Sequence, residues 1–109
     1  MKRKDVGFVF DALGDPTRRQ LVARLGSLGS ATPTELAYDL PISRQAVSKH
    51  LTMLANAGLV SFSRQGRQTI YRLTPEPFEE AVSWMTQVGE EWDDRLASLR
   101  TQLKRKRKR

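Results

Sequence analysis

The sequence predicts a mostly α-helical fold with a small β-hairpin, arranged as a winged helix-turn-helix with about five helices. One observation is a change of hydrophobic period within residues 41–71, from the spacing of a helix to the alternation of strands. The other is a pair of helix start signals that lie close together in the sequence, so that only a tight turn can connect the two helices. For 109 residues we expect one domain over residues 1–103 and a basic tail over residues 104–109.

The positive charge of the chain is unevenly distributed. Nine of the 19 Lys and Arg residues lie in residues 2–4 and 104–109, which leaves 10 basic against 12 acidic residues elsewhere. The segment between Leu40 and Pro75 contains no acid and five basic residues: Arg44, Lys49, Arg64, Arg67 and Arg72. Such a segment forms a positive surface, as attraction to nucleic-acid phosphates requires.

Composition argues against several other classes of protein. With no cysteine and one histidine, the chain offers neither a disulfide framework nor a thiolate metal site. We recognise no nucleophile with a base, no metal cluster and no phosphate loop, so an enzyme is the weakest hypothesis and no cofactor is expected. The sequence shows no apolar run of membrane-spanning length and no hydrophobic leader, so a cytoplasmic protein without membrane contact is expected.

The first expected helix covers residues 5–13. Its apolar residues follow helical spacing along one side: Val6, Val9, Phe10 and Leu13. Phe8 lies off this side, which indicates either a packing partner in another subunit or a helix sunk in the core.

The second helix is expected to begin at Pro16, with Asp15 as its N-cap. Its buried face would consist of Leu21, Val22 and Leu25. Gly26 and Gly29 are expected to bound the loop that follows. The arginines of this helix are open to two interpretations, phosphate contact or plain exposure to solvent.

The third helix shows the same kind of start signal. Thr32 is an N-cap followed by Pro33, and Glu35 completes a capping box. The helix is expected to run through Leu40, where Pro41 stops it.

A capped helix follows after a short connection. Ser43 is placed to cap a helix that starts at about Arg44, and Gly58 is placed to end it. One side is apolar, with Val47, Leu51, Leu54 and Ala55, and the opposite side is polar, with Gln45, Ser48, Lys49 and Thr52. We therefore expect one face to be core and the other to enter the major groove of DNA.

Alternating residues then predict a β-hairpin, with strands at 60–65 and 69–73 separated by Gly66 and Arg67. With arginine near its tip, this hairpin is expected to lie along the DNA backbone as a wing over residues 60–73.

The last helix is expected to begin at Thr74–Pro75 and to continue to Leu103. Its apolar residues recur every three or four positions for about seven turns, which is too long for one small core to cover. The pattern therefore indicates a partner.

Four segments together are similar to the ArsR/SmtB family of bacterial winged-helix repressors: ALGDPTRRQLVARL (12–25), ELAYDL (35–40), SRQAVSKHLTMLANAGLV (43–60) and GRQTIYRL (66–73). The resemblance implies a homodimer that binds an inverted-repeat operator on the bacterial nucleoid and represses its own operon. It also places the first and last helices at the dimer interface.

The resemblance assigns roles to individual residues. Its DNA-facing positions are Ser43, Arg44, Gln45, Ser48, Lys49 and His50 in the helix over residues 43–57, and Arg64 and Arg67 in the wing. For His50 we favour a structural role over base reading. The dimer interface would consist of Val6, Phe8, Phe10, Trp84, Val88, Trp92, Leu96 and Leu99.

The sequence departs from the metal-sensing members of this family. The positions that carry metal-binding cysteines in those members are Thr32 and Thr34 here, and the acidic last helix has no histidine. We therefore predict no metal site, and a small-molecule effector stays unknown. The alternative function is a winged-helix module that docks a protein or RNA. A module of that kind should expose a more apolar face than the polar one that Gln45, Ser48 and Lys49 form here.

Overall fold

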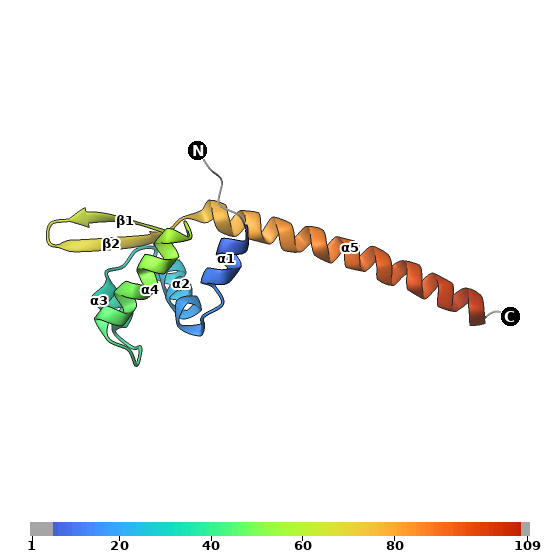
Figure 1. The fold of residues 1–109 in the computed structure, drawn as a ribbon, viewed down its shortest axis with the longest axis horizontal. Coiled ribbons are helices and arrows are strands. Elements are labelled where there is room, and N and C mark those ends of the chain that lie inside the picture. The colour runs from blue at the N-terminus through green and yellow to red at the C-terminus, as the bar shows by residue number, and fades with distance from the viewer. Residues whose placement is uncertain (1–5, 108–109) are drawn as a thin grey trace.

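Five helices and one two-stranded sheet make up the described chain, in the predicted order. The computed structural model describes residues 6–107. Its elements are α1 (Val6–Ala12), α2 (Pro16–Leu28), α3 (Pro33–Ala37), α4 (Arg44–Asn56), β1 (Val60–Gln65), β2 (Gln68–Leu73) and α5 (Pro75–Arg107). Figure 1 shows α1–α4 and the hairpin at one end of the molecule, with α5 projecting away along the 75 Å long axis. The predicted fold class is confirmed.

Helix α2 begins where its capping signals predict but ends later. The Asp15 carboxylate accepts a hydrogen bond of 3.0 Å from the Arg18 backbone N–H, and Gly29 closes the helix with a φ of +84°. The expectation that Gly26 bounds the following loop is wrong, because Gly26 lies within α2. A Cβ at Gly26 would lie 3.7 Å from Leu73 Cδ1, so β2 packs closely against this part of α2.

Helix α3 has the predicted start but is shorter than predicted. The Thr32 backbone N–H donates to Glu35 Oε1 at 2.8 Å, and the Glu35 backbone N–H donates to Thr32 Oγ1 at 3.1 Å, which completes the capping box. The helix ends at Ala37, and the Leu40 N–H then donates to Ala37 O at 3.1 Å in a tighter turn. Because the residue before a proline disfavours the helical conformation, Pro41 keeps Leu40 out of α3.

Helix α4 has the predicted start and end. Ser43 Oγ accepts a hydrogen bond of 3.1 Å from the Ala46 backbone N–H. At the other end Gly58 has a φ of +81°, and the Leu59 N–H donates to Leu54 O at 2.9 Å. This closing pattern satisfies a carbonyl that the last turn leaves unpaired.

Strands β1 and β2 form the predicted hairpin. Their register pairs Gln65 with Gln68 and leaves a two-residue turn in which Gly66 has a φ of +63°. A positive φ at only the first central residue is typical of a type II′ turn. The sequence did not reveal a further pairing, in which Ala31 and Tyr71 exchange two backbone hydrogen bonds of 3.0 and 2.8 Å. This bridge ties the segment before α3 to β2.

The hydrophobic core joins the first four helices to the start of the hairpin. Its largest fully buried side chains are Val9, Leu21, Leu25, Leu36, Val47, Leu51, Leu54 and Leu59. Two arginines of α2 fasten α1 to this core: Arg18 Nε donates to Ala12 O, and Arg19 Nη1 donates to Leu13 O, each at 2.6 Å. They satisfy carbonyls that the end of α1 leaves unpaired.

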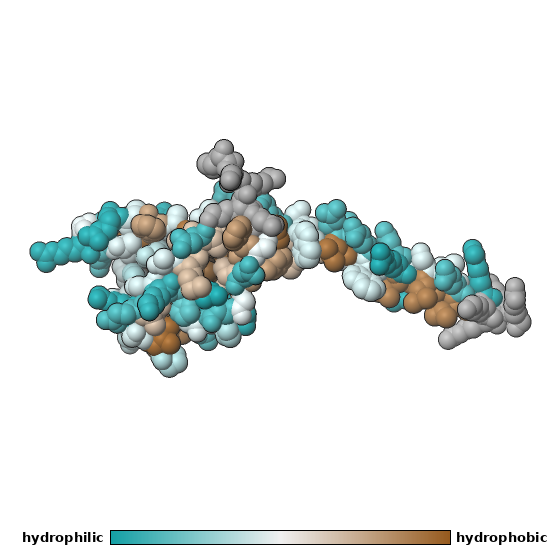
Figure 2. Space-filling model, in the orientation of Figure 1, coloured by the Kyte–Doolittle hydropathy of each residue, from teal (hydrophilic) through white to brown (hydrophobic). Residues whose placement is uncertain are grey.

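Helix α5 touches the core only near its start. Ala81 is buried, and the ring of Trp84 meets the ring of Phe10 edge-on with centroids 5.5 Å apart. From Gly89 to Arg105 every residue is exposed, and Figure 2 shows apolar side chains spaced along this projecting part. No helix in the described part of the chain is long and apolar enough to cross a membrane.

The basic run at the end of the chain begins as part of this helix. Residues 104–107, which the sequence assigns to a separate tail, continue α5 without a break. Residues 108–109 and the basic residues at 2–4 lie outside the described residues.

Candidate nucleic-acid interface

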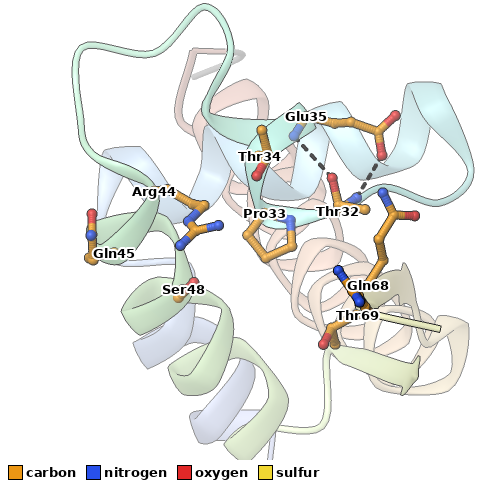
Figure 3. A pocket seen from close by; sticks show the side chains of 10 residues that line it. Thr32, Pro33, Thr34, Glu35, Arg44, Gln45, Ser48, Gln68 and Thr69 are labelled. Atoms are coloured by element: carbon orange, nitrogen blue, oxygen red, sulfur yellow. Dashed lines mark hydrogen bonds between the residues drawn. The ribbon is translucent and has the colours of Figure 1, made fainter. Parts of the chain in front are cut away.

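Three segments distant in the sequence converge on one groove of about 780 Å³: the start of α3, the start of α4 and the hairpin turn with the adjoining end of β2 (Figure 3). Four of the lining residues were predicted to face DNA, namely Arg44, Gln45, Ser48 and Arg67. The other lining residues are Thr32, Pro33, Thr34, Glu35, Gln68 and Thr69.

Helix α4 supplies one wall of this groove from its polar face. Val47 and Leu51 are fully buried, whereas Arg44, Gln45 and Lys49 are exposed. The predicted division of α4 into a core face and a free face is therefore correct. Figure 3 shows the Arg44 side chain extending from the first turn of α4 toward Pro33. The N–H groups of that turn have no carbonyl partner within the helix, and they add partial positive charge at the same end of the groove.

The electrostatics of the groove favour an anion. Arg44 and Arg67 line it from α4 and from the hairpin turn, and Glu35 is the single acid among its ten lining residues. The Glu35 carboxylate is already engaged, because its Oε1 accepts the Thr32 backbone N–H in the capping box. A phosphate backbone would therefore meet two guanidinium groups and one hydrogen-bonded carboxylate.

The other four predicted residues lie outside the groove lining, namely Ser43, Lys49, His50 and Arg64. Ser43 caps α4, and Lys49 is exposed one turn further along the helix. Arg64 is exposed on β1, where it pairs in register with Thr69 of β2.

His50 is directed toward the start of α2 rather than into the groove. Its Nδ1 lies 3.4 Å from Arg18 Nη1 and 4.0 Å from Asp15 Oδ2. The Arg18 backbone N–H, which donates to this carboxylate, holds the pKa of Asp15 below its ordinary value, and the charges of Arg18 and His50 act in the same direction. This arrangement connects α4 to the N-cap of α2, which favours the structural role for His50.

The chain is similar in sequence and in structure to known transcriptional regulators. A helix-turn-helix domain family matches residues 13–61. The HTH-type transcriptional regulator YuzN of Bacillus subtilis is 40% identical over 80 residues, covering 68% of this chain and 87% of that protein. The transcriptional repressor SdpR of the same organism is 34% identical over 77 residues, covering 71% and 84%. An ArsR-like transcriptional regulator from Rhodococcus sp. RHA1 superimposes with a TM-score of 0.73 at 37% identity, covering 86% and 88%.

The chain belongs to the ArsR family of transcriptional regulators. Its function is accordingly DNA-binding regulation of transcription, rather than catalysis or the docking of a protein or RNA.

Several groove residues of this ArsR-family chain were not predicted to contact DNA. Thr34 is exposed at the start of α3, and Gln68 and Thr69 follow the hairpin turn. Their capping and strand roles were visible in the sequence. Their convergence depends on how α3 packs on α4 and β2, which no local pattern reveals.

The residues present do not fit a soft-metal site of the ArsR metal sensors. Thr32 and Thr34, the positions that the resemblance equates with the cysteines of such sensors, are poor ligands for soft metals, and the Thr32 hydroxyl already accepts the Glu35 N–H at 3.1 Å. Within residues 6–107, no three His, Cys, Asp or Glu side chains are grouped so that they could hold a metal ion.

Proposed function

We propose that the protein is a repressor that binds an inverted-repeat operator as a homodimer. The observation that carries this proposal is the convergence of the polar face of α4 and the hairpin turn on one positively charged groove. The recognition helix would comprise residues 43–57 and the wing residues 60–73.

The DNA-binding residues have distinct roles in this proposal. Arg44 and Gln45 occupy the first turn of α4, the end from which recognition helices reach base edges. Arginine pairs with guanine and glutamine with adenine through two hydrogen bonds each. Phosphates would be held by Ser43, Ser48 and Lys49 in the recognition helix and by Arg64 and Arg67 in the wing. His50 would hold α4 against α2 instead of touching DNA.

The homodimer is supported by apolar surface that the chain itself leaves uncovered. Trp92 is 58% exposed and Trp84 is 50% exposed, although tryptophan is favoured at interfaces. Phe8 and Phe10 of α1 and Leu96 and Leu99 of α5 are exposed as well, while Val6 and Val88 are half-buried. A soluble monomer rarely exposes this much contiguous apolar surface, so a second copy would cover it.

The basic residues at 104–109 would add attraction to phosphates that does not depend on DNA sequence. The winged domain over residues 1–103 would then account for specificity. On this proposal the protein acts on the nucleoid in the bacterial cytoplasm.

Selection of bound duplexes from a random DNA pool tests the proposed function. The expected result is enrichment of one motif repeated in inverted orientation, with half-site centres separated by a whole number of helical turns. Failure to enrich any motif, with binding that depends on salt alone, would overturn the assignment of α4 as a sequence reader.

A further inference from the structure

A second cavity, of about 270 Å³, lies between α1, α2 and α4. Among the described residues, it shares no lining residue with the groove assigned to DNA. Its walls are largely apolar: Ala12 and Ala57 are buried there, while Phe8 and Met53 are 54% and 51% exposed. A largely apolar cavity with a few polar groups is the usual form of a small-molecule site, and sites for drug-sized ligands measure about 300–1,000 Å³. This cavity therefore fits a smaller molecule.

Arg18 is the one basic residue among the described residues that line this cavity. Its Nε donates to Ala12 O at 2.6 Å. The other contacts of the guanidinium group are long: Nη1 lies 3.4 Å from Met53 Sδ and from His50 Nδ1, and Nη2 lies 3.5 Å from Asp11 O. The imidazole nitrogen is the acceptor in its contact, because a guanidinium group only donates. The positive charge of Arg18 therefore meets neutral acceptors at the cavity wall.

A carboxylate would be a better partner for Arg18 than these neutral acceptors. Its two oxygens match two parallel N–H groups of a guanidinium, and such charge-assisted bonds are roughly twice as strong as neutral ones. We propose that the cavity binds a small molecule with a carboxylate and an apolar body, and that this molecule is an effector of DNA binding. The carboxylate takes Nη1 and Nη2 of Arg18, and the body lies against Phe8 and Met53. Binding does not depend on the repressor function proposed above, whereas the effect on the operator rests on it.

The same guanidinium group connects the cavity to α4, the helix proposed to read DNA. Arg18 holds the end of α1 through Ala12 O and reaches α4 through His50 and Met53. A ligand that takes Nη1 removes both contacts to α4. The ligand and the position of α4 described above then compete for one side chain, so ligand binding should lower the affinity for the operator. By linkage, the operator should lower the affinity for the ligand by the same factor.

Asp11 determines which kind of carboxylate is favoured. It lines the cavity from α1 and is exposed. Two sources provide the shared chemistry: a simple carboxylic acid, and a free apolar amino acid, which carries an ammonium group beside its carboxylate. The negative charge of Asp11 repels a simple acid and attracts the ammonium group. Asp11→Asn should therefore strengthen the binding of a simple acid and weaken the binding of an amino acid.

Four ligands that share a phenyl ring test the site on the wild-type protein: phenylacetate, its uncharged amide phenylacetamide, the amine phenethylamine, and free phenylalanine. Calorimetry should show saturable binding of phenylacetate or free phenylalanine, at least about 10-fold tighter than that of phenylacetamide. Equal affinities for phenylacetate, free phenylalanine and the amide would overturn carboxylate recognition. Tightest binding of phenethylamine would overturn it in favour of a cation held by Asp11. Absence of saturable binding by all four would show a hydrated gap only.

A pair of arginine variants tests the guanidinium group. Arg18→Gln keeps a donor but loses the charge, so it should weaken the binding of the tighter carboxylate about 10- to 100-fold. Arg19→Gln is the matched control, because Arg19 also holds the end of α1, through Leu13 O at 2.6 Å, but does not line the cavity. It should bind the ligand as the wild type does. Equal losses in two variants that keep their circular dichroism spectra would overturn the site.

The effect on DNA is measured by titrating the tighter carboxylate into the operator complex at fixed ionic strength. The operator affinity of the wild type should fall about 5- to 100-fold at saturation, and Arg18→Gln should lose this response. Phe8 also belongs to the surface assigned to the homodimer, so sedimentation at the same concentrations follows the oligomeric state. A fall in affinity that accompanies dissociation of the dimer would overturn the coupling through Arg18.

The two proposals fail in different ways. A ligand that binds at Arg18 without changing operator affinity would overturn the effector role. A protein that selects no operator from random DNA would overturn the proposed function, while calorimetry on the free protein would still decide whether the cavity recognises a carboxylate.

Discussion

Arg44 and Gln45 are two exposed side chains whose position at the start of α4 gives them the base-reading role in the proposed complex. Replacing either by alanine should cost about 1–3 kcal/mol of binding free energy on the operator and little on a random duplex. Fluorescence anisotropy titrations with both duplexes at one salt concentration measure the difference.

The control for these variants is Gln87→Ala, which changes an exposed glutamine on α5 away from the groove. It should leave both affinities unchanged. Equal losses on operator and random duplex for Arg44→Ala or Gln45→Ala would show that these residues hold phosphates rather than read bases.

Asp15 gives the fold a dependence on acid pH. The Arg18 backbone N–H lowers the pKa of Asp15 in the folded state, compared with an unfolded value of about 3.9. The stabilisation that this carboxylate provides is therefore fully present above the unfolded pKa and is lost as the pH falls through the folded pKa. Asp15→Asn keeps a capping oxygen but does not titrate. The difference in free energy of unfolding between wild type and variant should shrink as the pH falls below about 4.

Urea unfolding of both proteins at a series of pH values checks this. A difference that stays constant between pH 6 and pH 3 would mean that Asp15 does not carry a lowered pKa.

At the scale of elements, the starts and ends that depend on local bonds were predictable. The structure confirms Thr32 and Ser43 as N-caps and Gly58 as the residue that ends α4. Each of these roles depends on hydrogen bonds or backbone angles within a few residues, which the local sequence determines. The end of α3 at Ala37 was missed, and so was the bridge between Ala31 and Tyr71. That bridge joins segments 40 residues apart, which a periodic pattern does not connect.

The candidate site divides in the same way. The wall formed by α4 was predictable because one helix carries both its core face and its free face. The contribution of α3 was not, because it depends on packing between α3, α4 and β2. Arg18 is a further example. Its Nε donates to Ala12 O, and its Nη1 lies 3.4 Å from His50 Nδ1. From the sequence, the arginines of α2 had only two interpretations, phosphate contact or exposure to solvent.

The hairpin turn offers a test at this scale. Gly66 has a φ of +63°, so Gly66→Ala should strain the turn by about 1 kcal/mol, whereas Gly66→Asn should be tolerated better. Because the wing is proposed to hold the DNA backbone, the alanine variant should lower affinity similarly for operator and random duplex. A loss confined to the operator would instead give the wing a share in base reading.

At the scale of the whole molecule, the chain consists of a DNA-binding part, made of α1–α4 and the hairpin, and a long α5. Most of the apolar residues of α5 are exposed, because the DNA-binding part does not cover them. With the proposed homodimer as the DNA-binding form, regulation would follow from any change in the equilibrium between monomers and dimers. The proposed dimer makes occupancy of the operator depend on the concentration of the protein itself. A ligand lodged between helices near Trp84 and Trp92, both half exposed, would act on the same balance.

Divalent metals should not release this protein from DNA. A ligand shifts an equilibrium only by its different affinity for the two states, so a metal switch needs a site that closes in one of them. The densest acidic group, on α5, is spread around the helix: Glu90 neighbours Asp93 and Asp94, whereas Glu91 neighbours Asp94 alone. Carboxylates of this kind hold calcium or magnesium loosely. They do not provide the soft ligands and closed geometry that zinc, copper or arsenite require.

Titrating zinc, copper, nickel and arsenite into the operator complex at fixed ionic strength should leave the bound fraction of DNA nearly constant. Stoichiometric release that a chelator reverses would show that ligands outside the described residues, or from the second copy, complete a site.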